Sequence, residues 1–323
     1  MIRAGGAGEG TDLISTGNRL RLENKEKGRA MRMPRKCVWA MLGAGFVLLL
    51  IARAAATDQL KPEEIAGRAA WETFLETADI VTGREMGQGV TRPWRLTLEK
   101  NGVRHDAVWK DVDRTVTNRG ERVRDSWKSE VAAYRLAKLI GLDTVPPYVE
   151  REFAPPPSTR KRKGSLSFWV ESRMNYLEMQ EQDISFPAGR AIEFDRAKYL
   201  VRLWDCLIAN ADRTQQNILL TEDWRTIMID HSRAFQPAAR FARQLIFGAD
   251  GMQKLDDDRP LLIRLVPRAT YERILALDAK TIRGAAGAFL DQGQIDGIIA
   301  RIALIRKEVE AMAAAEGETK VFY

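Results

Sequence analysis

Three polar side chains in the segment 210–235 stand beside short apolar runs, and their spacing is the strongest chemical signal in the chain. Asp212 and Asn217 lie five residues apart, the apolar run 218–220 follows, and a second apolar run ends on Asp230. A strand–turn–strand hairpin would place Asn217 beside Asp230, with Asp212 just outside. Two oxygen ligands for a metal ion and a separate carboxylate facing an attacking hydroxyl are what a Mg²⁺–nucleotide site requires.

Each of these residues also has an ordinary structural interpretation. Asp212 alone would form an Asx-turn after a helix, and Asn217 would be a turn residue before a strand. Asp230 would cap the turn that follows it, but an acid directly after three apolar residues is costly unless it is paired or bound to metal. The combined spacing favours the functional interpretation, in which Asp212 is the catalytic acid/base and Asn217 and Asp230 bind the metal ion.

A lysine and a glutamate upstream form a candidate phosphate clamp. The Asn-Gly pair at 101–102 predicts a hairpin whose second strand ends on Lys110. Glu130 follows twenty residues later, in the first turn of a predicted helix capped by Ser126 or Ser129. A Lys–Glu pair between strand and helix would hold the ammonium toward nucleotide phosphates. The alternatives are a solvated strand lysine and an acid that favours the helix dipole.

A glycine-rich turn at 82–89 precedes this hairpin. Its glycines do not spell the G-x-G-x-x-G pattern, but the backbone amides of Gly87 and Gly89 could cover nucleotide phosphates. A flexible turn is an equally good interpretation of the same residues.

The order Asp-x-x-x-x-Asn, hairpin, Asp resembles the catalytic loop and metal-binding aspartate of kinases. The spellings A-D-R and D-H-S, where ordinary protein kinases have H-R-D and D-F-G, resemble an atypical group. This group comprises HipA-like kinases, bacterial phosphatidylinositol 3-/4-kinase-like proteins and secretory kinases of the Golgi casein kinase type. The upstream segments A-V-W-K and S-E-V-A-A-Y-R-L-A-K-L-I-G-L-D-T-V-P-P continue the similarity, which covers roughly residues 80–235. The resemblance implies transfer of a phosphoryl group from ATP, with Mg²⁺ or Mn²⁺, to a hydroxyl.

The predicted elements indicate an α+β, two-lobed kinase-like fold. Strand and turn signals over 80–172 predict a small antiparallel sheet with one inserted helix, and the polar stretch 112–126 is expected to be a loop. We place the N-lobe at 57–172 and the mostly helical C-lobe, which carries the catalytic hairpin, at 173–323. Nucleotide would bind between the lobes. Outside the sheet, helices are predicted over 61–78, 194–208, 268–277, 279–289 and 294–315.

The first 56 residues differ from the rest of the chain in pattern. Residues 1–30 are interpreted as a non-structural extension or a misassigned start, and residues 31–56 combine a positive region, an apolar run and small residues. This layout is typical of a secretory signal peptide. The apolar run 37–52 is short for a spanning helix, so a membrane anchor is the alternative. We therefore expect a protein that is exported, periplasmic or secreted, or anchored to a membrane.

The net charge of +7 is concentrated in this leader, which holds ten basic and four acidic residues and leaves 41 and 40 for residues 57–323. This balance gives no reason to expect nucleic-acid binding. Cys37 lies in the apolar run, so the processed chain would keep Cys206 alone. We therefore expect no internal disulfide. We also expect no zinc cluster, because His105 and His231 are well separated in the sequence. An exported protein without disulfides suits a bacterial envelope.

The residues favour an enzyme, and they leave the acceptor open: it could be a protein, lipid or sugar hydroxyl. A catalytically inactive kinase-like module for binding or scaffolding is one alternative, although such modules commonly lose one of these polar residues. Transfer of AMP from a flipped nucleotide is another. Export would also place the domain where ATP is scarce, which requires an unusual donor or a position on an ATP-bearing side.

Overall fold

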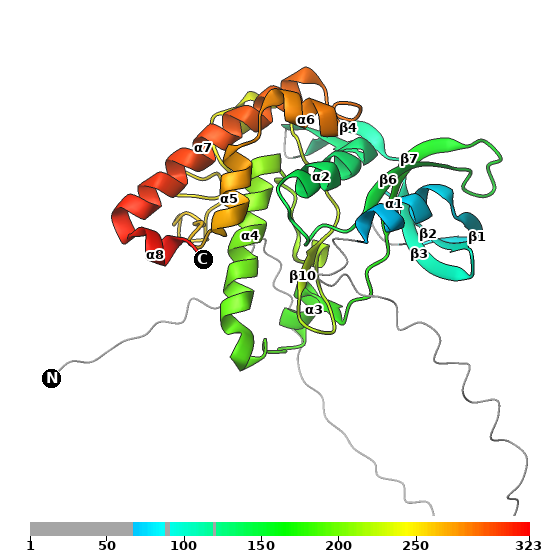
Figure 1. The fold of residues 1–323 in the computed structure, drawn as a ribbon, viewed down its shortest axis with the longest axis horizontal. Helices are drawn as coiled ribbons and strands as arrows, with labels where there is room; N and C mark the ends of the chain where they lie inside the picture. Colours follow the sequence, from blue (N-terminus) through cyan, green and yellow to red (C-terminus); the bar gives the residue numbers. More distant parts are fainter. Residues whose placement is uncertain (1–66, 88–90, 119–120) are drawn as a thin grey trace, which may run out of the picture. The chain divides into compact units, whose positions relative to one another are not determined.

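The computed structural model describes residues 67–87, 91–118 and 121–323. The predicted leader and Gly89 lie outside these ranges. Within them, a five-stranded antiparallel sheet with strand order β1-β2-β3-β7-β6 forms first along the chain (Figure 1). Its strands are β1 (Asp79–Glu85), β2 (Trp94–Lys100), β3 (Val103–Lys110), β6 (Tyr148–Phe153) and β7 (Arg162–Phe168).

The β2–β3 hairpin is present as predicted and brings Lys110 to the end of a central strand. Asn101 and Gly102 both have positive φ, 51° and 78°, as a two-residue type I′ turn requires. Along β3, burial alternates, so Trp109 faces the core and Lys110 lies on the opposite face of the sheet.

Two helices pack against this sheet. α1 (Arg68–Thr77) buries Phe74 and Leu75 in the sheet's own core. α2 (Trp127–Leu139) begins at Ser126, whose side chain accepts a hydrogen bond from the backbone N of Lys128 at 3.2 Å. Ser126 is therefore the cap, while Ser129 is buried and donates to the carbonyl of Ala234 at 3.3 Å.

The prediction of a loop over 112–126 is wrong. This segment forms an antiparallel ribbon of β4 (Asp113–Asn118) and β5 (Glu121–Ser126). A two-stranded ribbon can satisfy its backbone by cross-strand pairing while its side chains stay polar, so composition alone does not reveal it. The end of β5 is fixed by the N of Ser126, which donates to the carbonyl of Ser232 at 2.8 Å.

The rest of the chain is mostly helical and carries a small sheet in the order β10-β9-β8 (Figure 1). The predicted helices at 194–208, 268–277, 279–289 and 294–315 are present with shifted ends. The strands are β8 (Met174–Asn175), β9 (Ile218–Leu220) and β10 (Thr226–Met228). The helices are α3 (Tyr176–Glu181), α4 (Ala191–Ile208), α5 (Arg268–Leu275), α6 (Ala279–Ala286), α7 (Gln292–Glu316) and α8 (Glu318–Val321), with 3₁₀ turns η2 (Ala188–Arg190), η3 (Gln215–Asn217) and η4 (Ala239–Ala242).

One hydrophobic core joins α2 to the helical part. Val131 and Tyr134 of α2 belong to the same buried cluster as Leu203 and Trp204 of α4. A second, smaller cluster combines buried side chains of the sheet with Phe74 and Leu75 of α1 and Ile227 of β10, and α2 also contacts β6 and β7 of the sheet. α2 is thus the element that contacts both parts, and Glu130 on its first turn is carried to the boundary between them.

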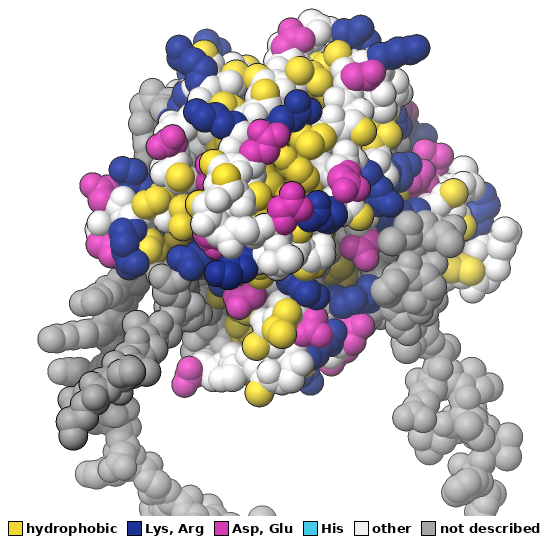
Figure 2. Space-filling model, turned by 60° about the vertical axis from the view of Figure 1, so that its left-hand side comes forward, with side chains coloured by type: hydrophobic (Ala, Val, Ile, Leu, Met, Phe, Trp, Pro, Cys, Tyr) yellow, Lys and Arg dark blue, Asp and Glu magenta, His cyan; other side chains and the backbone are white. Residues whose placement is uncertain are grey.

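No helix in the described part of the chain is long and apolar enough to cross a membrane. The apolar run 37–52 lies outside that part. On the face shown in Figure 2, Lys/Arg and Asp/Glu side chains are interspersed. This mixture agrees with the balanced charge of residues 57–323.

Gly164 on β7 allows close packing against the strand that carries Lys110. A Cβ there would lie 2.3 Å from the carbonyl O of Lys110 and 2.8 Å from the Trp109 ring. We expect Gly164→Ala to lower the free energy of unfolding by about 1–3 kcal/mol, because a backbone atom must move. Urea unfolding would measure this. Gly189→Ala, where a Cβ meets nothing within 4 Å, is the matched control; equal stability of the two variants would contradict the expectation.

Candidate active site

The expected hairpin places Asn217 beside the end of the second strand. β9 and β10 are antiparallel, with Ile218 opposite Met228. The N of Ile229 donates to the carbonyl of Asn217 at 3.1 Å. Asn217, at the end of η3, therefore lies next to the residue that precedes Asp230. The backbone thus places residues 217 and 230 on two adjacent chain segments.

A buried arginine that the sequence interpretation assigned to no site holds this arrangement together. Arg213 makes a bidentate ion pair with Asp205 of α4, at 3.0 Å from Nε and 2.8 Å from Nη2. Its Nη1 also donates to the carbonyls of Asn217 at 3.3 Å and Ile229 at 2.6 Å. One guanidinium thus links the helix, the loop and the strand end. The signal in the sequence is Asp205, an acid within the apolar stretch Leu-Trp-Asp-Cys-Leu-Ile, which needs a buried partner.

Lys110, Glu130 and Asp230 form a three-charge cluster in which Glu130 is buried and Asp230 is partly exposed. The Nζ of Lys110 lies 2.9 Å from Oε1 of Glu130 and 3.0 Å from Oδ1 of Asp230. The other oxygen of Glu130 accepts a hydrogen bond from the N of His231 at 3.0 Å. Asp230 has a positive φ of 57°, and Ser232 Oγ donates to its Oδ1 at 3.1 Å. Strand, helix and post-hairpin turn are joined at this ammonium.

The charges in this cluster shift one another's pKa. Burial opposes the charge of Lys110, but Asp230 and Glu130 outweigh it and raise the pKa of Lys110. Burial also opposes the charge of Asp230, yet the ammonium of Lys110 lowers the pKa of Asp230 to about 2. Two carboxylates share one ammonium, and burial raises the pKa of Glu130, which is fully enclosed. Asp230 is therefore the member that stays ionised most readily.

Asp212 lies beside the cluster and is only partly enclosed, its side chain being 44% exposed. Burial and the nearby charge of Asp230 raise its pKa, while Arg233 opposes that shift. Arg233 Nη1 pairs with Oδ2 of Asp212 at 2.8 Å. A half-exposed carboxylate with a raised pKa is suited to accept a proton from an approaching group.

Comparison with solved structures identifies the fold. The matches include a hydra Fam20 structure with sugar, with 13% identity, a TM-score of 0.55 and coverage of 78% of this chain and 90% of the other. They also include the Golgi casein kinase with Mn/ADP bound, with 14% identity, a TM-score of 0.51 and coverage of 79% and 78%. A further Golgi casein kinase structure matches with 14% identity, a TM-score of 0.52 and coverage of 79% and 77%. The fold is that of Fam20 and the Golgi casein kinase.

This result confirms the predicted α+β, kinase-like fold and the Golgi casein kinase side of the resemblance. The resemblance to HipA-like and phosphatidylinositol kinase-like proteins stays a prediction. No protein-family model and no curated protein matches the sequence.

The Fam20-like fold brings five of the predicted site residues together: Lys110, Glu130, Asp212, Asn217 and Asp230. Gly87 lies just after β1, is exposed and has a positive φ of 66°. Within the described residues Gly87 makes no hydrogen bond or ion pair with the charged cluster, and its role stays a prediction.

The described residues contain no group of three or more His, Cys, Asp or Glu side chains that could hold a metal alone. The donors at the hairpin are the Asn217 amide and the Asp230 carboxylate. Two hard oxygen donors fit Mg²⁺ or Mn²⁺ when phosphate oxygens and water complete the coordination. The donor set therefore fits a metal–nucleotide pair better than a free-standing ion.

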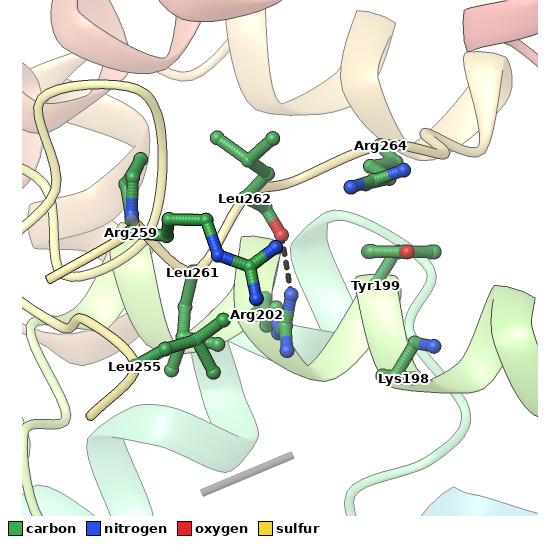
Figure 3. Close-up of a pocket in the computed structure, with 9 residues that line it drawn as sticks. Lys198, Tyr199, Arg202, Leu255, Arg259, Leu261, Leu262 and Arg264 are labelled. Carbon is green, nitrogen blue, oxygen red and sulfur yellow. Dashed lines mark hydrogen bonds between the residues drawn. The ribbon is translucent and has the colours of Figure 1, made fainter. Parts of the chain in front are cut away.

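A cavity of about 190 Å³ lies elsewhere, between α4 and the segment 255–264 (Figure 3). None of the predicted site residues lines it. Two of its cations are paired with neighbouring acids, Lys198 with Asp195 at 2.7 Å and Arg259 with Asp257 at 2.7 Å. The cavity is lined by Lys198, Tyr199, Arg202, Leu255, Arg259, Pro260, Leu261, Leu262 and Arg264.

Removal of the Lys110 ammonium should destabilise the protein strongly. Lys110→Met leaves Glu130 buried beside Asp230 without a counter-ion, which we expect to cost about 3–5 kcal/mol in unfolding free energy. Lys163→Met breaks an exposed pair with Glu150 at 2.6 Å and should change the free energy of unfolding little, because solvent screens such a pair. Chemical denaturation would compare the two. Addition of Glu130→Gln to Lys110→Met should recover part of the loss; no recovery would contradict the charge explanation.

The lowered pKa of Asp230 predicts a component of acid sensitivity. Its folded pKa of about 2 lies below the ordinary value of 3.8, so the stabilisation is complete above pH 3.8 and is lost as pH falls through 2. Because the side chain is partly exposed, we expect the component to be about 1 kcal/mol. Unfolding free energies between pH 5 and about pH 2 should decline less in Asp230→Asn than in the unchanged chain. The exposed Glu316→Gln is the control, and the same decline in all three would refute the assignment.

Proposed function

We propose that the chain is an ATP-dependent phosphotransferase that uses Mg²⁺ or Mn²⁺ and moves the γ-phosphoryl group to a hydroxyl acceptor. The observation that carries the proposal is the Lys110 ammonium, held 2.9 Å from Glu130 and 3.0 Å from Asp230. An ammonium fixed by a glutamate on the neighbouring helix is the arrangement that positions a lysine for nucleotide phosphates.

The other residues take roles that follow from their chemistry. The ammonium of Lys110 would neutralise phosphate charge, and Asn217 and Asp230 would hold the metal ion. When bound, the metal would neutralise charge that develops on the phosphate oxygens. Asp212 would orient the acceptor hydroxyl and take its proton. The amides of Gly87 and Gly89 would cover the phosphates.

The structural neighbours support this choice of ligands. The Golgi casein kinase structure holds Mn and ADP, and the hydra Fam20 structure holds sugar. The first agrees with a nucleotide and a divalent metal, and the second makes a sugar hydroxyl a reasonable acceptor beside protein and lipid hydroxyls. The acceptor class remains part of the proposal.

We also propose the organisation of the chain: a leader at 31–56 behind the extension 1–30, an N-lobe at 57–172 and a C-lobe at 173–323. The Golgi location in the neighbour's name is compatible with export. An N-terminal sequence of the native protein that begins before residue 57 would refute cleavage of this leader.

Nucleotide binding by the full chain tests the proposal. Titration calorimetry should show ATP binding that requires Mg²⁺ or Mn²⁺, weakened about tenfold or more by Asp230→Ala. Asp212→Asn should bind nucleotide normally and lose about 10²–10⁴-fold in turnover. Asp223→Asn, on the surface turn of the hairpin, is the control with unchanged binding and turnover.

Absence of metal-dependent binding by the unchanged chain would refute the proposal. Binding without turnover on protein, lipid and sugar hydroxyls would favour the inactive binding module. ATP labelled at the γ or the α phosphorus separates phosphoryl transfer from AMP transfer, because only the latter carries the α label to the acceptor.

A further inference from the structure

A buried acid is connected to the candidate catalytic base through one arginine. Arg233 Nη1 lies 2.8 Å from Oδ2 of Asp212, and its Nε lies 3.7 Å from Oδ2 of Asp125 at the end of β5. Asp125 belongs to the ribbon before α2, whereas Asp212 belongs to the loop after α4. Arg233 comes three residues after Asp230, so the chain Asp125–Arg233–Asp212 spans three separate segments of the site.

Asp125 is enclosed far more completely than its partners. It is 0% exposed, and neither carboxylate oxygen accepts a hydrogen bond from the described residues. Among the described residues, Arg233 is the one cation that forms an ion pair with Asp125. A buried carboxylate is costly unless it is compensated, so the position of the Arg233 guanidinium matters more to Asp125 than an exposed ion pair would.

The backbones on both sides are held together independently of this ion pair. The Gln236 side chain accepts from the N of Arg124 at 2.9 Å and donates to the carbonyls of Arg124 at 2.7 Å and Arg233 at 2.9 Å. The N of Ser126 donates to the carbonyl of Ser232 at 2.8 Å. Asp125 and Arg233 therefore lie on two segments whose backbones are held together by hydrogen bonds.

We propose that Asp125 and Arg233 are positioning residues for Asp212, and this rests on the proposed function. Arg233 binds Oδ2 of Asp212, and the ion pair with Asp125 fixes the position of the Arg233 guanidinium. The Asp212 carboxylate is thereby oriented with Oδ1 toward the acceptor. In the transfer, the acceptor O–H bond breaks and its proton goes to Asp212. A bond forms between the acceptor oxygen and the γ-phosphorus, and the bond from that phosphorus to the bridging oxygen breaks as ADP leaves.

If Asp125 and Arg233 position Asp212, their substitution should lower turnover and leave nucleotide affinity unchanged. ATP hydrolysis, in which water replaces the unknown acceptor, can be measured on the full chain. We expect Asp125→Asn to lower kcat about tenfold and Arg233→Gln about a hundredfold, since a small misplacement of a catalytic group has effects of this size. Affinity for Mn²⁺–ATP should stay within about twofold, because neither residue is placed on the phosphates or the metal.

Two further variants separate positioning from general damage to the fold. Arg233→Lys keeps the charge between the two acids and should recover part of the turnover lost in Arg233→Gln. Asp106→Asn breaks a partly buried pair with Arg95 at 2.6 Å on β3, away from Asp212, and should leave kcat unchanged. Equal losses in Asp106→Asn and Asp125→Asn, unchanged kcat in Asp125→Asn, or a parallel loss of nucleotide affinity would overturn the proposal.

A second measurement does not depend on turnover. The ¹³C carboxyl signal of Asp212, assigned with Asp212→Asn, should move in both Arg233→Gln and Asp125→Asn and stay in place in Asp106→Asn. If the chain binds no nucleotide, the proposed function fails, and this signal still decides the geometry. If the chemical shift of the Asp212 carboxyl is unchanged in Asp125→Asn, the positioning role is overturned.

Discussion

The candidate site depends on one ammonium that is shared by two carboxylates. Lys110 reaches Glu130 and Asp230 at 2.9 and 3.0 Å, and these three residues come from β3, from α2 and from the turn after β10. Glu130 is fully buried and needs the lysine as its counter-ion, while burial of Lys110 is compensated by both acids. The strand, the helix and the turn are therefore held in one arrangement by mutual charge compensation. In the proposed function, this arrangement would preorganise the ammonium for a phosphate.

A second buried ion pair restrains the loop that follows α4. The Asp205–Arg213 pair holds the loop from α4, and the remaining nitrogen of the guanidinium binds carbonyls on both sides of the hairpin end. The loop thus has few conformations open to it, although it carries polar side chains at the surface. Asp212 differs from Asp205 in being partly exposed, as the proposed role toward an acceptor hydroxyl requires.

Local sequence signals predicted much of the fold for identifiable reasons. The Asn-Gly turn requires two positive φ values, and only a tight hairpin uses them in sequence. The helices α4 and α7 follow from long apolar periodicity. The β4–β5 ribbon was missed because its pairing satisfies the backbone without an apolar face. Arg213 and Arg233 were missed as site residues because an arginine in a loop is usually solvated, and only a distant acid gives it a buried role.

The sequence by itself determined which chemistry is available: an Asp, an Asn and an Asp at kinase-like spacing, with a lysine and a glutamate upstream in the right order. Strand and helix periodicity are local properties, so they also set the order of elements. Only the tertiary structure decided which charges meet. The pairing of Lys110 with Asp230 and that of Asp125 with Arg233 join residues 120 and 108 positions apart. Contacts over such separations depend on the packing of α2 in the helical core and against β6 and β7, and no local pattern in the chain encodes that packing.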